Sequence, residues 1–122
     1  MPVEASEFME TANGFMGQEG ATEIQCRNAG SRAYYALFHA ALNTIERKGL
    51  TLVKVQSAGS HESVIATLCS MGHSAKSISE SMSRIKRFRH DCDYHVDLEI
   101  GPKKTAMQVS EAQILIGKLS RL

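Results

Sequence analysis

The sequence predicts an all-α fold, an up-and-down bundle of four longer helices and one short helix. Only two prolines occur in 122 residues, and aromatic residues make up 6% with no tryptophan, which is unlike an aromatic-rich β-sandwich. Apolar residues recur at three- and four-residue intervals in five segments, separated mainly by glycines. With 43% hydrophobic and 22% charged residues, we expect a single globular domain over residues 1–122.

The first two helices are predicted over residues 3–16 and 22–48. The first has apolar residues at helical spacing, at Val3, Phe8, Ala12, Phe15 and Met16. The second carries two adjacent apolar stripes, Ala33, Leu37, Ala41, Ile45 and Tyr34, Phe38, Leu42. So wide an apolar face is typical of the central helix of a bundle. Gly49 is its expected C-cap, after two basic residues that suit the negative end of the helix dipole.

The same spacing predicts the last three helices over residues 61–71, 76–95 and 104–122. Ser60 and Ser74 are the expected N-caps of the first two of these helices. The helix over 76–95 has one apolar stripe, formed by Ile78, Met82, Ile85, Phe88 and Cys92. A glycine and a proline precede the final amphipathic helix.

No segment suggests a membrane protein or a disulfide-linked protein. The longest apolar run, residues 36–42, is interrupted by His39 and is too short to span a bilayer. An acidic N-terminal segment is unlike a secretory signal, so we expect a cytoplasmic protein. The three cysteines form no C-x-x-C pair, so we expect them to be reduced and mostly buried.

The densest polar segment is residues 84–95, where four cations fall within six residues and histidines follow, although the net charge is only +1. Helical geometry predicts Arg89 on one edge of the apolar stripe and His95 near the other. Asp91 is four residues before His95 and can orient its imidazole. Arginine and histidine side by side suit phosphodiester transfer, because one binds phosphate and the other moves protons near neutral pH. The alternative is a solvated face with ion pairs.

We expect no metal site in this segment, because no second histidine or carboxylate pair stands at the usual ligand spacing from His95. A second polar anomaly is the pair Arg32 and His39 within the most apolar helix. One interpretation is packing, with Arg32 paired to Asp91 or Asp93. The other is that both belong to a site, because residues seven apart share a helix face.

The run Asn28-Ala-Gly-Ser-Arg-Ala-Tyr-Tyr-Ala-Leu-Phe-His-Ala-Ala41, followed by Arg89-His-Asp-Cys-Asp-Tyr-His95, resembles a HEPN domain (higher eukaryotes and prokaryotes nucleotide-binding) of the small bacterial and archaeal branch. The resemblance covers residues 3–119. Asp93-Tyr94 matches an Ala-Asp-Tyr element of that branch, with cysteine in place of alanine. The Asp-Tyr pair has a structural alternative, in which Tyr94 packs on one of the tyrosines at 34 and 35.

The resemblance implies a homodimer and, in active members, a metal-independent endoribonuclease with an arginine, a polar residue and a histidine as its motif. Arg89, His90 and His95 fit this motif, with five residues between the arginine and the second histidine. Arg84 with His90 has the same spacing, but an isoleucine follows that arginine, so it fits less well. In the family, the motifs of two subunits form one composite site. If Ile85, Phe88 and Cys92 meet their symmetry mates, the Arg89 edge of one helix can approach the His95 edge of the other.

In the implied mechanism an RNA 2′-hydroxyl attacks the adjacent phosphate. His95 transfers the proton, Arg89 stabilises the developing charge, His90 assists orientation, and no cofactor is needed. Arg84, Lys86 and Arg87 are expected to bind RNA or nucleotide, with supporting roles for Asp91, Asp93, Tyr94, Arg32 and His39.

The resemblance further implies the toxin of a toxin–antitoxin or phage-defence system, with a nucleotidyltransferase as its possible antitoxin. Two alternatives stay open. One is a catalytically inactive HEPN module that binds nucleotide, RNA or a nucleotidyltransferase partner. The other is a purely structural helical adaptor.

Overall fold

The computed structural model describes residues 3–17, 20–56 and 59–122, and these form five α-helices and no strand. The helices are α1 (Ala5–Met16), α2 (Glu23–Arg47), α3 (Ser60–Cys69), α4 (His73–Tyr94) and α5 (Pro102–Ser120). Each lies within a few residues of its predicted range. The prediction of an all-α bundle is therefore confirmed.

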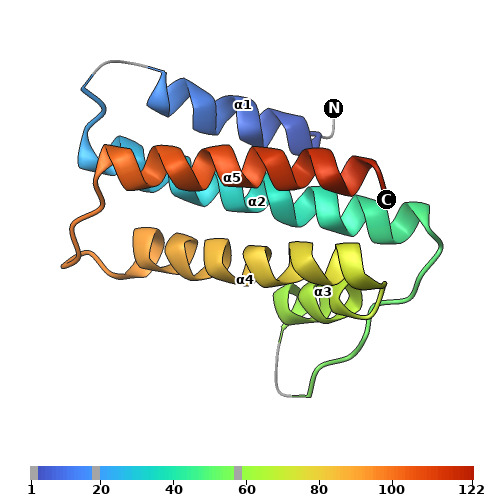
Figure 1. Cartoon of the computed structure of the whole chain (residues 1–122). Helices are drawn as coiled ribbons and strands as arrows, with labels where there is room; N and C mark the ends of the chain where they lie inside the picture. Colours follow the sequence, from blue (N-terminus) through green and yellow to red (C-terminus); the bar gives the residue numbers. More distant parts are fainter. Residues whose placement is uncertain (1–2, 18–19, 57–58) are drawn as a thin grey trace.

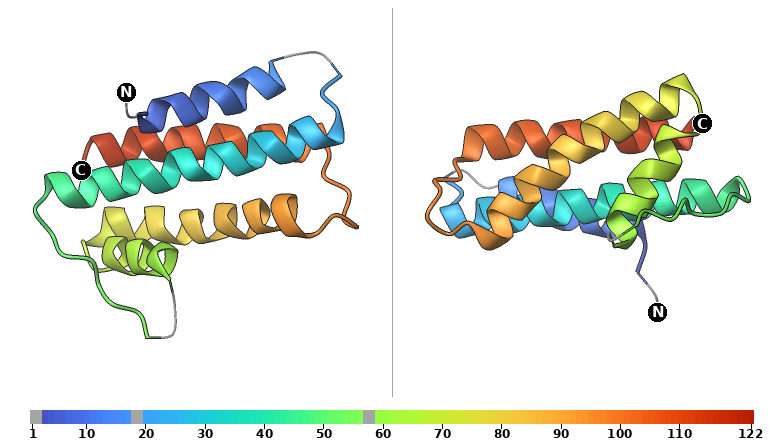
Figure 2. Two further views of the ribbon diagram at one scale, coloured as in Figure 1. Left: turned by 180° about the vertical axis from the view of Figure 1, so that it is seen from behind. Right: turned by 90° about the horizontal axis from the view of Figure 1, so that it is seen from below.

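Helix α2 is the centre of the bundle and packs against all four other helices. In Figure 1, α1, α5, α2 and α4 run alongside one another, while the short α3 lies beside α4. Figure 2 shows that the start of α1 and the end of α5 lie at the same end of the bundle. The largest fully buried apolar side chains come from four helices and include Tyr34, Leu37, Ile45, Leu68, Met82, Ile85 and Leu119. Removing this apolar area from water is the main favourable contribution to folding.

The apolar stripe of α4 is buried within the single chain, from Ile78 to Cys92. The suggested contact of Ile85, Phe88 and Cys92 with a second copy is therefore wrong, because these side chains are already buried within the single chain. Four of the buried side chains form a separate small cluster beneath the end of α4: Cys26, Phe88, Cys92 and Ile100.

Helices α2 and α4 approach each other closely at Gly30. A Cβ atom added there would lie 2.7 Å from Phe88 Cε2 and 2.8 Å from Cys92 Sγ, closer than carbon–carbon or carbon–sulfur contact allows. The missing side chain thus lets the α2 backbone approach the last turns of α4. Polar side chains of α2 before and after Gly30 can therefore form hydrogen bonds with the end of α4.

The helix ends differ from the predicted caps by one or two residues. Gly49 follows the C-cap, and at φ 69° its N–H donates to the Glu46 carbonyl. Ser60 and Ser74 are not N-caps, because Gly59 and Gly72 take those positions. Gly72 has φ 111°, a conformation that lets the chain reverse direction between α3 and α4. None of the described helices combines the length and apolarity needed to cross a membrane.

Candidate functional site

The cations of α4 point in different directions rather than forming one basic strip. Arg84 pairs with Glu111 of α5 at 3.2 Å, and Lys86 pairs with Glu62 of α3. Arg89 turns inward to α2. Successive helical residues are rotated by about 100°, so a run of basic residues spreads around the helix. The predicted RNA-binding set is therefore divided between two faces.

A surface groove between α3 and α4 is lined by Glu62 of α3 and by Ser83, Lys86, Arg87 and His90 of α4. Arg87 is exposed, and the structure gives it no ion pair within the described residues. Of the three predicted RNA-binding cations, two thus lie beside a candidate site residue. Arg84 is not among the groove-lining residues.

Arg89 is only 7% exposed and packs between α4 and α2. Its guanidinium carbon lies 5.0 Å from the Tyr34 ring and 5.7 Å from the Tyr35 ring, within the range of cation–π contact. Its Nη1 lies 3.6 Å from Asp93 Oδ2, and that carboxylate also accepts a hydrogen bond from Ser31. The buried Nε has no hydrogen-bond partner among the described residues. Arg89 therefore holds α4 to α2 in this conformation.

His61 of α3 joins the same interior region, and the sequence analysis did not single it out. The Tyr34 hydroxyl and His61 Nδ1 are 2.5 Å apart, and the imidazole stacks on Phe38 at a 4.4 Å centroid separation. Burial lowers the pKa of His61, and the positive charges of Arg89 and Lys86 lower it further. Burial likewise raises the pKa of Tyr34. The lowered pKa of His61 favours its neutral form.

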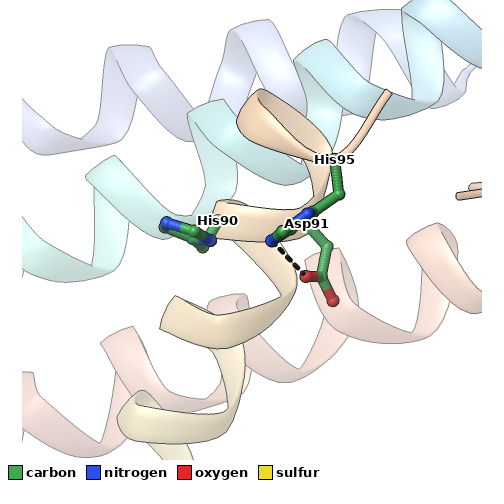
Figure 3. A group of neighbouring side chains, drawn as sticks. All are labelled: His90, Asp91 and His95. Atoms are coloured by element: carbon green, nitrogen blue, oxygen red, sulfur yellow. Dashed lines mark ion pairs between the residues drawn. The ribbon is translucent and has the colours of Figure 1, made fainter. Parts of the chain in front are cut away.

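The exposed side of the α4 end carries His90, Asp91 and His95 (Figure 3). His95 Nε2 lies 3.8 Å from Asp91 Oδ1, as their i, i+4 spacing predicts. The two imidazole centroids are 5.2 Å apart. His95 leaves the helical conformation with φ −109° and ψ 74°, immediately after α4 ends at Tyr94. Two imidazoles and one carboxylate consequently share one small surface.

Arg27 of α2 fixes the backbone of this region, and the sequence analysis did not single it out. Its buried guanidinium donates hydrogen bonds to four carbonyl groups at and beyond the end of α4, those of Asp91, Cys92, His95 and Leu98. The last carbonyls of a helix have no partner within the helix, so a cation there is stabilising. Glu23 balances the charge of Arg27 at 3.4 Å and accepts the Ile100 N–H, which lowers the pKa of Glu23.

The predicted pairing of Arg32 with Asp91 or Asp93 is wrong, because those carboxylates pair with His95 and Arg89 respectively. Arg32 instead lies over two aromatic rings, 5.8 Å from that of Phe8 and 5.2 Å from that of Tyr35. His39 also contacts Phe8, with ring centroids 5.0 Å apart. Arg32 and His39 do share a face, but that face is directed towards α1.

The expected packing of Tyr94 on Tyr34 or Tyr35 is also wrong. Tyr94 is 66% exposed and its ring lies 4.8 Å from the His90 ring, while Arg89 covers the two α2 tyrosines. Among the cysteines, Cys26 and Cys92 are buried and Cys69 is exposed, and all three are free. Burial raises the pKa of Cys92 to about 12, which makes this thiol a poor nucleophile at neutral pH.

The sequence analysis expected no metal-ligand set, whereas the structure brings three ligand-type side chains together. One ligand atom from each of His90, Asp91 and His95 lies within 4.8 Å of the others. The simple spacing rules missed this group because His95 lies just outside the helix. No family model matches the chain, and no curated protein matches it.

Proposed function

We propose that this protein is a HEPN-type, metal-independent endoribonuclease whose catalytic side chains are on the exposed end of α4. The observation that carries the proposal is the pairing of His95 with Asp91 at 3.8 Å, with the His90 ring 5.2 Å from the His95 ring. An imidazole oriented by a carboxylate is suited to proton transfer near neutral pH. His95 removes the proton of the RNA 2′-hydroxyl, and the 2′-oxygen attacks the adjacent phosphorus to form a cyclic phosphate. The bond to the 5′-oxygen breaks, and that oxygen leaves as a hydroxyl after taking a proton from water. His90 orients the phosphodiester.

The groove beside His90 supplies the phosphate contacts. Arg87 is exposed there, and Lys86 lies next to it, although Glu62 neutralises part of its charge. A guanidinium can hold two phosphate oxygens at once and stabilise the charge that builds up on them. Arg89, whose guanidinium is buried against Tyr34 and Tyr35, acts in this proposal as a positioning residue for the end of α4.

A homodimer is part of the proposal, but its interface must differ from the apolar stripe of α4. Three large, exposed apolar side chains lie at and after the end of α4: Tyr94, Val96 and Leu98. Exposed apolar residues grouped beside a site are typical of interaction surfaces. A second copy bound there would bring two histidine clusters together. Val96→Asp should then convert a dimer to a monomer in multi-angle light scattering.

The test is cleavage of total RNA by the purified protein in excess EDTA. We expect cleavage by the wild-type protein and a fall of at least about 100-fold in rate for His95→Ala, because general acid–base catalysis contributes about 10²- to 10⁴-fold. His73→Ala is the matched control, since His73 is an exposed histidine at the other end of α4. Full activity in His95→Ala, or no cleavage by the wild-type protein, would contradict the proposal. A toxin role further predicts growth arrest on expression, relieved by a nucleotidyltransferase antitoxin.

The burial of Arg89 specifically favours a second candidate, a catalytically inactive HEPN module that binds a nucleotide or a nucleotidyltransferase partner. In this case the buried Arg89 cannot contact a phosphate, and the groove cations Lys86 and Arg87 bind the ligand without taking part in catalysis. The expected result is a rise in melting temperature with a nucleotide while RNA stays intact. The Arg87→Ala variant should lose that rise.

A further inference from the structure

We propose that His90, Asp91 and His95 form a binding site for a divalent transition-metal ion of the zinc class. Two imidazole nitrogens and one carboxylate oxygen are a ligand set that Zn²⁺, Co²⁺ and Ni²⁺ accept. The ligand atoms lie within 4.8 Å of one another, on an exposed surface that an ion can reach directly (Figure 3). The inferred site is distinct in chemistry from the proposed ribonuclease, which needs no metal.

The ligand atoms need only a small movement to bind one ion. Metal–ligand bonds of about 2.0–2.1 Å place tetrahedral ligands about 3.4 Å apart. The His95–Asp91 distance of 3.8 Å is already close to that value. The side chains of His95 and Asp91 are 47% and 40% exposed, so their rotamers are free to adjust. Three protein ligands leave the fourth position open to water.

The backbone that carries two of these ligands is held in place before any ion binds. Arg27 donates hydrogen bonds to the carbonyls of both Asp91 and His95. These bonds fix the position of His95 beyond the end of α4, where its ring lies over the last helical turn. A fixed backbone lowers the entropic cost of assembling ligands. Glu23 pairs with Arg27 and so reduces the repulsion that its positive charge would exert on a cation.

Metal binding and ribonuclease activity should exclude each other. The ion would take both His95 Nε2 and the Asp91 carboxylate, so Asp91 could no longer orient the imidazole for proton transfer, and zinc is expected to inhibit cleavage. This inhibitory consequence depends on the proposed function, whereas the binding site itself does not. Inhibition should be reversed by EDTA.

Metal binding is tested by isothermal titration of the chelator-treated full chain with ZnCl₂. We expect one ion per chain, and at least tenfold weaker binding in both His90→Ala and His95→Ala. His73→Ala and Cys69→Ser are controls for an unrelated exposed histidine and for the exposed thiol. Circular dichroism of each variant checks that the helices are retained. Unchanged zinc binding in both site variants, or the absence of binding by the wild-type protein, would overturn the proposal.

A parallel assay of RNA cleavage separates this inference from the proposed function. Zinc binding without cleavage in EDTA supports the metal site and contradicts the ribonuclease. Cleavage in EDTA without zinc binding supports the ribonuclease and contradicts the metal site. If the wild-type protein both binds zinc and cleaves RNA, we expect at least tenfold inhibition by saturating zinc, and faster cleavage with zinc would contradict the competition between the ion and catalysis.

Discussion

The last two turns of α4 carry ionisable side chains on two faces, an inward face directed towards α2 and an outward face directed towards solvent. The side chains of the two faces differ in burial and in pairing. On the inward face Arg89 is buried, stacked on tyrosines and paired with Asp93. On the outward face His90 and His95 are exposed and Asp91 is half-exposed, with a 3.8 Å contact between His95 and Asp91. The inward charged groups are paired within the chain, apart from the Arg89 Nε. The outward groups are free to bind a ligand.

The difference shows that orientation, more than residue type, decides which polar side chains are available for chemistry. A buried charge must be compensated by the fold, so it becomes part of the packing. An exposed pair of imidazoles costs the fold little and can exchange protons or ligands with solvent. Variants of the two faces should therefore separate loss of stability from loss of function.

The largest expected stability effect follows from Arg27→Met. This change keeps most of the side-chain volume but leaves four carbonyl groups at the end of α4 without their donor. We expect the free energy of unfolding to fall by about 3 kcal/mol, the usual cost of removing one member of a buried charged network. Urea denaturation followed by circular dichroism measures it. A loss below about 1 kcal/mol would show that water replaces Arg27.

A smaller loss is expected for Gly30→Ala. The new methyl group would lie 2.7 Å from the Phe88 ring, so α2 and α4 must separate at a cost of about 1–3 kcal/mol. Gly14→Ala is the matched control, because it lies in α1 with no atom near the new methyl group. Alanine should stabilise that helix by about 0.5–1 kcal/mol. Opposite signs in thermal denaturation would confirm the close approach of α2 and α4, and equal effects would contradict it.

A pH-dependent effect is expected from His61. The pKa of His61 in the folded state is below the unfolded value of about 6.5. At pH values between the two pKa values, the unfolded chain therefore binds more protons than the folded chain. The free energy of unfolding should therefore fall as the pH drops from about 7 through about 6.5 and level off below the folded pKa. His61→Gln should reduce this dependence, and His73→Gln should retain it. Denaturation midpoints measured at several pH values decide between the two results.

The smallest effect is expected from Arg84→Met, because Arg84 is an exposed residue of α4. The Arg84–Glu111 pair is solvent-exposed, and such pairs contribute about 0–1 kcal/mol. We expect a change below about 0.5 kcal/mol in urea denaturation. A loss similar to that of Arg27→Met would remove the distinction between buried and exposed charges.

The sequence was sufficient to predict the helices and the contact between Asp91 and His95, because both follow from local spacing. It did not predict the hydrogen bonds of Arg27 to the end of α4 or that of His61 to Tyr34, because these partners are more than twenty-five positions away along the chain. The sequence placed Arg89 at an edge of the apolar stripe and left open that Tyr94 packs on Tyr34 or Tyr35, whereas Arg89 takes that position and Tyr94 is exposed. A small error in helix rotation is enough to move a side chain from the core to the surface. The position of His95 beyond the last helical turn, which assembles the three-ligand group, depends on the backbone at a helix end.

The most direct test of the functional role of the outward face is the ratio of RNA cleavage rates, in EDTA, of His95→Ala and His73→Ala. Both variants remove one exposed histidine of α4, from opposite ends of the helix. We predict that His73→Ala matches the wild-type protein and that His95→Ala is at least about 100-fold slower. Equal rates in the two variants would contradict a catalytic role for the end of α4.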